Sequence, residues 1–345
     1  MNKWYLSGGA NTDVAVSTRV RFARNLTGFP FPGRMSSSQR EQVNGLVREA
    51  AMHLTGEFAG VFHYAEMKEL SDLEAASLVE QHFISPEFAV NREGKALLMS
   101  EDETISIMLC EEDHIRIQVM SAGEDLQAVY EQAVRLDEAL DQRLHFAFDE
   151  RLGYLTGCPT NLGTGMRASV MLHLPALEQA DALRQLANTL GKVGLTLRGT
   201  YGEGSDAKGA LYQISNQITL GLTEQAAIEN LQTVTHQIMD RERQARNQLK
   251  QNEAFVDKVW RCYGILKFAR SLDSEEFLQY ISWVRLGVKL SILKNVDMEK
   301  VGRLLVITQP ATLQKICGGP LEPRERDQKR AEMVREALSC SNEME

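Results

Sequence analysis

The sequence predicts an α+β fold in which helices flank a largely antiparallel sheet, followed by an all-α C-terminal domain. Over roughly the first two-thirds of the 345 residues, short segments with alternating apolar residues are interspersed with amphipathic helices. After about residue 223 nearly every segment has helical spacing. The length suits about two domains, and we place their boundary near residue 245, with domains at 1–245 and 246–345.

The sheet is expected to begin with residues 14–22, which are short, β-branched and alternating. Ser38 and Glu41 then predict a capping box at the start of a helix with apolar residues three and four apart. Residues 114–120 read as the return arm of a hairpin after an acidic turn. The complete set of later strands is expected at 96–100, 104–110, 114–120, 167–174, 195–198 and 210–220.

Three helices are expected among and after these strands. Residues 124–145 are amphipathic, Pro175 opens a helix that reaches about Lys192, and residues 224–250 form a charged helix. In the C-terminal domain, the segment 277–293 carries more apolar surface than a small bundle can bury, which predicts self-association. The helices of this domain are expected at 253–271, 274–282, 284–293, 297–307 and 323–338.

The composition excludes several classes of protein. The net charge is −9, which argues against a generic polyanion binder, so we expect no direct contact with nucleic acid. Five cysteines without a CxxC pair fit neither a disulfide framework nor a zinc site, and we expect no metal ligated by protein side chains. Without a signal-peptide pattern or an apolar run of about 18 residues, the chain is expected to be cytoplasmic and not membrane-bound.

Arginines occupy the polar faces of several expected strands. Each of them, taken alone, is more simply a solvated surface residue. Together they would repel one another unless a polyanion lies between them, and guanidinium groups suit bidentate contacts with phosphate. The five are Arg19, Arg21, Arg116, Arg167 and Arg198.

Two carboxylates and a cysteine accompany these arginines. Glu112 lies four residues before Arg116, Glu203 follows Arg198, and Cys158 precedes Arg167. Ordinary turn carboxylates and a small buried thiol are the simpler interpretations of the three. The chain has neither a P-loop nor the signatures of eukaryotic protein kinases, so any nucleotide would be bound in another way.

Four separate blocks resemble the active-site motifs of the phosphagen (guanidino) kinases, in the same order along the chain. They are STRVR at 17–21, CEEDHIRI at 110–117, CPTNLGTGMRASV at 158–170 and RGTYGEGS at 198–205. The helical domain after residue 245, with the motif RDQKRA, makes the arrangement similar to the bacterial protein-arginine kinases. The resemblance implies ATP-dependent phosphorylation of arginine side chains in proteins.

The resemblance also assigns roles to residues. Glu112, Glu203 and Cys158 would be catalytic: the carboxylates hold the substrate guanidinium and one accepts its proton, while the cysteine lies beside it. ATP would be accompanied by Mg²⁺ that bridges the phosphates without dedicated protein ligands. The implied ATP-binding residues are Ser17, Thr18, Arg19, Val20, Arg21, His82, Arg116, Arg167, Ala168, Ser169, Val170, Met171, Arg198, Gly199, Thr200, Tyr201, Gly202 and Glu203.

The C-terminal domain would mediate dimerisation or higher assembly and would contain an allosteric phosphoarginine pocket. From the residues alone a charged, solvated helix is the simpler interpretation of the motif, and the resemblance reverses this preference. The pocket would comprise Arg326, Asp327, Gln328, Lys329, Arg330 and Ala331.

The resemblance further implies partners and a cellular role. The substrates would be proteins with exposed arginines, among them a heat-shock transcriptional repressor, and phosphorylation would mark them for degradation by a chaperone-protease in the stress response. A small zinc-binding protein would be the activator. Two other functions stay open: a kinase of free arginine or another small guanidino compound, and a non-catalytic phosphoarginine-binding adaptor.

Overall fold

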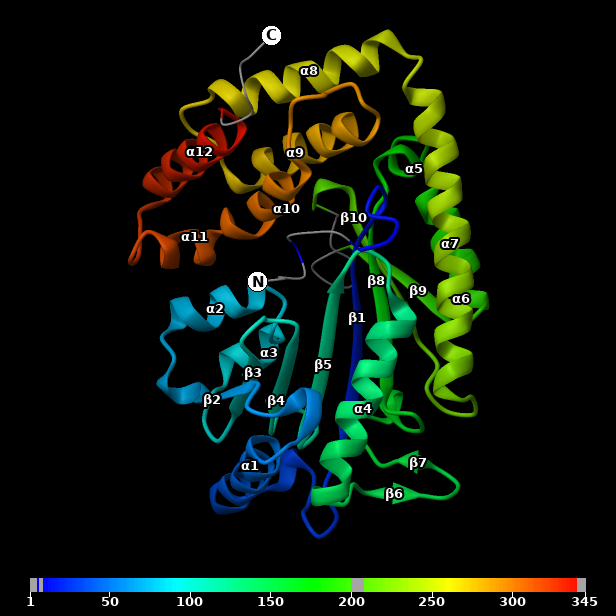
Figure 1. The fold of residues 1–345 in the computed structure, drawn as a ribbon, viewed down its shortest axis with the longest axis vertical. Helices are drawn as coiled ribbons and strands as arrows, with labels where there is room; N and C mark the ends of the chain where they lie inside the picture. Colours follow the sequence, from blue (N-terminus) through cyan, green and yellow to red (C-terminus); the bar gives the residue numbers. More distant parts are fainter. Residues whose placement is uncertain (1–4, 6–8, 200–207, 340–345) are drawn as a thin grey trace.

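A computed structural model describes residue 5 and residues 9–199 and 208–339. An eight-stranded antiparallel sheet forms the centre of the first part of the chain, and the helices that follow lie across one end of it (Figure 1). This arrangement confirms the expected fold class. In spatial order the strands are β2 (Phe62–Glu66), β3 (Ala96–Ser100), β4 (Ile105–Leu109), β5 (Ile115–Ala122), β1 (Ala15–Arg24), β8 (Met166–His173), β10 (Leu211–Asn216) and β9 (Leu195–Gly199).

One face of the sheet is packed against long helices. Strands β1, β5 and β8 alternate so that Val20, Ile117 and Val170 are fully buried against α4 (Leu126–Leu144) and α7 (Glu224–Leu249). Helices α1 (Ser37–Met52) and α6 (Leu183–Lys192) complete this layer beside β2 and β9. Arg19, Arg21, Arg116 and Arg167, which alternate with these buried residues, are therefore left on the opposite face.

Short helices cover part of that opposite face. Helices α2 (Asp72–Glu80) and α3 (Pro86–Val90) enclose a small apolar cluster with β3 and β4, built around Phe83, Phe88 and Met108. A two-stranded sheet, β6 (Phe148–Asp149) with β7 (Gly153–Tyr154), lies at the lower end in Figure 1.

Several local expectations were wrong. The capping box is formed by Ser36 and Gln39, since the Ser36 hydroxyl accepts from the Gln39 N–H at 3.3 Å and the Gln39 side chain returns to Ser36 N–H at 2.9 Å. The three consecutive serines there made the register ambiguous. The helix opened by Pro175 is interrupted at Asp181, whose φ of 53° is left-handed, so it forms α5 (Pro175–Gln179) and α6.

The C-terminal helices enclose a core of their own. It contains Val259, Leu266, Ile281, Val284 and Val334, and the helices are α8 (Glu253–Phe268), α9 (Ser274–Lys289), α10 (Met298–Ile307), α11 (Pro310–Ile316) and α12 (Pro323–Ser339). The two helices expected at 274–282 and 284–293 are the single helix α9. The boundary near residue 245 falls inside α7, and the division into two domains stays a prediction.

The expected apolar surface of segment 277–293 is not observed. Phe277, Leu278, Ile281, Val284 and Leu286 are buried within the C-terminal core. The large exposed apolar side chains of this part of the chain include Trp260, Ile265 and Phe268 on α8. No helix in the described ranges is long and apolar enough to cross a membrane.

Candidate active site

The strand register places all five arginines on one face of the sheet. Arg21 is paired directly with Arg167 on one side and with Gln118 on the other, and Gln118 lies two residues from Arg116. Arg198 is paired with Gln213, which is paired with Met171 on the strand of Arg167. Because residues opposite each other, or two apart, share a face, the guanidinium groups all lie opposite the α4 and α7 layer.

Burial and then mutual repulsion lower the pKa values of two of these arginines. Burial lowers the pKa of Arg19 to about 10, with a further contribution from Arg116. The pKa of Arg21 falls well below its usual value through burial and then through Arg19, Arg116 and Arg167. The Arg21 Nε atom is buried and has no hydrogen-bond partner among the described residues. An anion with several oxygens would relieve both the repulsion and the unmade hydrogen bond.

Two neighbouring carboxylates reach into this cluster. Glu111 Oε2 lies 2.5 Å from Arg116 Nη1, and Glu112 Oε2 lies 3.7 Å from Arg116 Nη2. Glu111 also accepts the Ser85 hydroxyl, so it is fixed by two partners. The Glu112 side chain is 44% exposed and is the freer of the two to meet a substrate cation. Glu111 was not anticipated, because strand alternation does not extend through the turn that contains both residues.

A buried carboxylate fixes the loop that carries the cysteine. Asp113 Oδ1 accepts from Asn25 Nδ2 and from the Gly157 N–H, each at 2.6 Å. Burial raises the pKa of Asp113, while these two hydrogen bonds lower it. A Cβ atom at Gly157 would lie 2.5 Å from the Glu112 carbonyl oxygen, so only glycine permits this approach. The acidic turn and Cys158 are thereby held side by side.

Cys158 lies at the edge of the arginine cluster. Its Sγ atom is 3.1 Å from the Thr160 hydroxyl, which also accepts from Arg167 Nη2 at 3.2 Å. Burial lowers the pKa of Arg167, and the neighbouring arginines, Arg198 first, lower it further, whereas Cys158 and Glu112 raise it. The thiol, Glu112 and the arginines therefore belong to one electrostatic site.

The remaining nucleotide-site residues are divided between the two faces. Ser169 and Met171 share the arginine face, whereas the side chains of Val20, Ala168 and Val170 are fully buried on the helix-covered face, so only their backbone atoms could meet a ligand. His82 follows α2, and burial together with Arg19 lowers its pKa to about 4. Thr200, Tyr201, Gly202 and the catalytic candidate Glu203 lie outside the described residues.

Part of the RDQKRA motif at residues 326–331 makes contacts within the C-terminal helices. Arg330 is 1% exposed and donates to the carbonyl oxygens of Thr308 and Leu272, at 3.0 and 2.7 Å, and to Asp327 at 2.7 Å. Lys329 pairs with Glu332 at 2.8 Å. Arg330 thus has a structural role in joining α12 to the helices beside it, and the phosphoarginine pocket stays a prediction.

Comparisons of the sequence with known families divide the chain in two. The family described as "ATP:guanido phosphotransferase, C-terminal catalytic domain" matches residues 42–245. The family described as "Protein-arginine kinase McsB C-terminal domain" matches residues 252–345. The matched ranges include Glu112, Cys158 and the whole of the RDQKRA motif.

Relatives of known identity match almost the full length. The protein-arginine kinase of Halothermothrix orenii is 46% identical over 341 residues, which cover 98% of this chain and 97% of the relative. That of Geobacillus stearothermophilus is 45% identical over 340 residues, with 98% and 94% covered.

Solved structures match the first part of the chain. The duplicated taurocyamine kinase from Schistosoma mansoni, with bound transition-state-analogue components, has a TM-score of 0.62 at 33% identity and covers 68% of this chain and 34% of that one. Lombricine kinase has a TM-score of 0.61 at 26% identity, with 68% of each chain covered.

Proposed function

This chain belongs to the protein-arginine kinases, and on that premise we propose that it transfers the γ-phosphoryl group of ATP to the guanidinium of arginine residues in proteins. The observation that carries the proposal is the cluster of five arginines on one sheet face, with the buried Arg21 Nε unpaired among the described residues. Such a cluster fits a triphosphate, whose oxygens can accept from several guanidinium groups at once.

In this proposal the arginines make the main contribution to catalysis by stabilising negative charge in the transition state. Phosphoryl transfer spreads negative charge over the equatorial oxygens of the moving group, and fixed cations stabilise that charge without reorganising. Arg116, Arg167 and Arg198 would supply these cations from three different strands. Mg²⁺ bound to the nucleotide would neutralise further phosphate charge, and the described residues contain no group of three or more His, Cys, Asp or Glu that could hold it.

The acceptor guanidinium must lose a proton as its nitrogen bonds to phosphorus. Glu112 lies at the rim of the cluster with its carboxylate half exposed, where it would orient the incoming guanidinium. Glu203 is proposed as its counterpart, so that one of the two carboxylates takes the proton released as the N–P bond forms and ADP leaves. Cys158 would orient the guanidinium by hydrogen bonding and would form no covalent intermediate.

The cellular role proposed for this activity rests on the resemblance alone. Phosphorylated arginines would mark proteins, including a heat-shock transcriptional repressor, for a chaperone-protease in the stress response. A small zinc-binding protein would activate the kinase, and a phosphoarginine bound in the pocket formed by residues 326–331 would regulate it.

A kinase of small guanidino compounds is the second candidate. Two solved structures that resemble the first part of the chain are named for taurocyamine and lombricine kinases. The helical C-terminal part that matches the protein-arginine kinase family favours a protein acceptor instead.

The two candidates differ in their acceptor. We would measure ADP release with a folded arginine-containing protein, with the same protein after chemical blocking of its arginines, and with free arginine. The proposal expects the highest kcat/KM for the unblocked protein. A higher value for free arginine would establish the small-guanidine kinase, and ATP binding without ADP release would establish an adaptor.

A further inference from the structure

The loop after α2 contains a left-handed residue that is not glycine. His82 has a φ of 63° and lies two residues after the end of α2. Its N–H donates to the Val79 carbonyl oxygen at 2.9 Å, and the Phe83 N–H donates to the Leu78 carbonyl oxygen at 3.0 Å. These two bonds form a Schellman motif, in which the left-handed position is usually glycine because a Cβ atom disfavours that conformation. A side chain is therefore kept at this position at a cost to the backbone.

The imidazole at this position is assigned to the candidate nucleotide site. Burial and then the charge of Arg19 lower the pKa of His82, so the imidazole lies close to an arginine of the cluster. Backbone strain of this kind persists only where the surrounding structure holds it, and it is concentrated at ligand sites. We therefore looked for the groups that fix the His82 backbone.

Two polar side chains of the sheet hold this loop. Gln118 Nε2 donates to the His82 carbonyl oxygen at 2.8 Å. The Ser106 hydroxyl donates to the Phe83 carbonyl oxygen at 2.9 Å and accepts from Gln118 Nε2 at 3.1 Å. Gln118 and Ser106 are both buried and are paired directly across β5 and β4. The carbonyl groups of His82 and Phe83 are thus anchored to neighbouring strands.

Gln118 also lies beside the arginine cluster. It is paired with Arg21 of β1, and residues paired in this way share a face of the sheet. A buried amide costs free energy unless it is hydrogen-bonded. The Gln118 amide nitrogen meets this need with the His82 carbonyl oxygen, the Ser106 hydroxyl and, at 3.4 Å, the sulfur atom of Met120. The amide therefore connects the arginine-bearing face to the loop that carries His82.

We propose that Gln118 is a positioning residue of the nucleotide site, which holds the His82 backbone so that the imidazole meets the bound nucleotide. Ser106 supports it by fixing both the Gln118 amide and the Phe83 carbonyl group. Gln118 itself would not contact the nucleotide. The inference rests on the proposed function through its nucleotide site, but its test measures ADP binding and requires no phosphoryl transfer.

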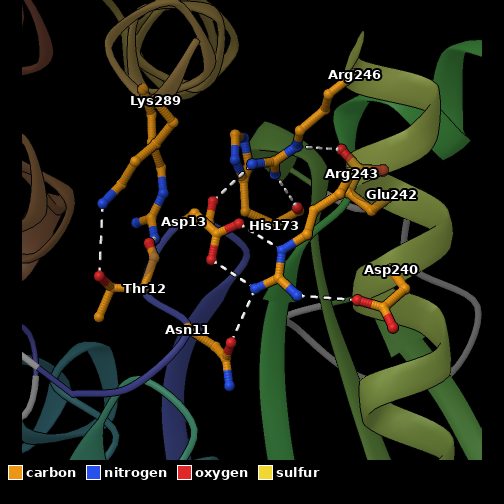
Figure 2. A network of polar contacts seen from close by, with 10 residues as sticks. Asn11, Thr12, Asp13, His173, Asp240, Glu242, Arg243, Arg246 and Lys289 are labelled. Atoms are coloured by element: carbon orange, nitrogen blue, oxygen red, sulfur yellow. Dashed lines mark hydrogen bonds and ion pairs between the residues drawn. The ribbon is translucent and has the colours of Figure 1, made fainter. Parts of the chain in front are cut away.

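A buried hydrogen bond elsewhere in the molecule supplies a matched control. Ser282 Oγ lies 2.8 Å from His173 Nε2, and both residues are buried where β8 meets α9. The His173 carbonyl oxygen also accepts from Arg246 at 2.7 Å, within the network shown in Figure 2. Ser282→Ala therefore removes a buried hydrogen bond between distant segments, as Gln118→Met does, but not one made by the loop after α2.

The test is a double-mutant cycle in ADP affinity, measured by calorimetry on the full-length protein. The second change is His82→Asn, which removes the imidazole but tolerates the left-handed backbone. We expect Gln118→Met to weaken ADP binding about fivefold in wild type and less than about twofold in the His82→Asn background, as for coupled residues in contact. KM for ATP should rise with Gln118→Met while kcat changes less, and Ser282→Ala should leave ADP affinity unchanged.

Several results would overturn the proposal. An equal loss of ADP affinity in both backgrounds would mean that Gln118 acts on the nucleotide or on Arg21 directly. Normal ADP binding by Gln118→Met would mean that His82 needs no such support. An equal loss in Ser282→Ala would show a general effect of lower stability. If Gln118→Met does not fold, Ser106→Ala replaces it in the same cycle. Wild-type protein that binds no ADP would overturn the proposed function and this inference with it.

Discussion

Arg21 and Arg24 lie three positions apart on β1 and meet opposite environments. Arg24 is fully buried on the helix-covered side, where Asp137 accepts from it at 2.8 Å and the Tyr154 ring centroid lies 3.4 Å from its guanidinium carbon. Arg21 faces the arginine cluster, and its Nε atom has no partner in the described part of the chain. The first guanidinium is paired within the fold, and we propose that the second is held in place for a ligand.

Replacing each of these arginines by methionine should separate stability from binding. Arg24→Met leaves Asp137 buried without its cation, so we expect a loss of about 3–5 kcal/mol of unfolding free energy. Arg21→Met relieves repulsion, so stability should be unchanged or higher while ADP binding weakens at least tenfold. Denaturant unfolding and calorimetry measure the two effects. An Arg21→Met protein as unstable as Arg24→Met, or one that binds ADP normally, would contradict the assignment.

The imidazole of His82 should remain neutral at physiological pH. Its pKa is about 4 in the folded protein, through burial and Arg19, against about 6.5 in an unfolded chain. The unfolded state therefore binds more protons between these values, and stability should fall as pH decreases from about 6.5 to about 4. His173, whose pKa burial also lowers well below 6.5, contributes in the same direction. His82→Gln should reduce this slope without removing it, and an unchanged slope in urea unfolding would count against the role of His82.

At the scale of elements, Glu80 joins α2 to the C-terminal part. Its carboxylate accepts from the Ala311 and Thr312 N–H groups, at 2.8 and 2.7 Å, and so caps α11. His82, a residue of the candidate nucleotide site, lies two residues after Glu80, so we expect this cap to help position it.

Glu80→Gln should weaken both the cap and the nucleotide site. The loss of a charge-assisted cap should cost about 1–2 kcal/mol of stability, and KM for ATP should rise while kcat changes less. Thermal unfolding and steady-state kinetics test this, with the exposed Glu336→Gln as control. A variant that loses stability but keeps the wild-type KM would show that α11 and the nucleotide site are independent.

The strands that carry the arginines could be predicted from the sequence, whereas contacts between distant segments could not. Strand alternation located β1, β5 and β8, and because the side-chain period is two, it also put the arginines on a common face. The hydrogen bonds that Asp113 accepts from Asn25 and Gly157 were not predicted. These residues are up to 132 positions apart in the sequence, and only the folded chain brings them together. The short helix α11 was missed because its start depends on Glu80 from a distant segment.

At the scale of the whole molecule, α8 exposes an apolar surface. Trp260, Ile265 and Phe268 are 50%, 37% and 69% exposed. Exposed apolar side chains can mark an interface, so we propose that the predicted self-association involves α8, since the apolar side chains of segment 277–293 are largely buried.

Charges on this surface should therefore prevent assembly. We expect wild-type protein to sediment as a dimer or larger, and the double variant Trp260→Glu, Phe268→Glu to sediment as a monomer. Val90→Glu alters an even more exposed apolar residue, on α3, and should leave the assembly intact. A monomeric wild type, or a double variant with wild-type sedimentation, would disprove this interface.

The chemical identity of the product tests the central claim most directly. A folded arginine-containing protein would be incubated with ATP, Mg²⁺ and this enzyme, and its phosphorus NMR spectrum recorded before and after mild acid. We predict a phosphoramidate resonance on the protein that acid removes and that Glu112→Gln greatly reduces. A phosphate signal that survives acid, as an ester on serine, threonine or tyrosine would, or no signal on the protein, would contradict the assignment of arginine phosphorylation to this site.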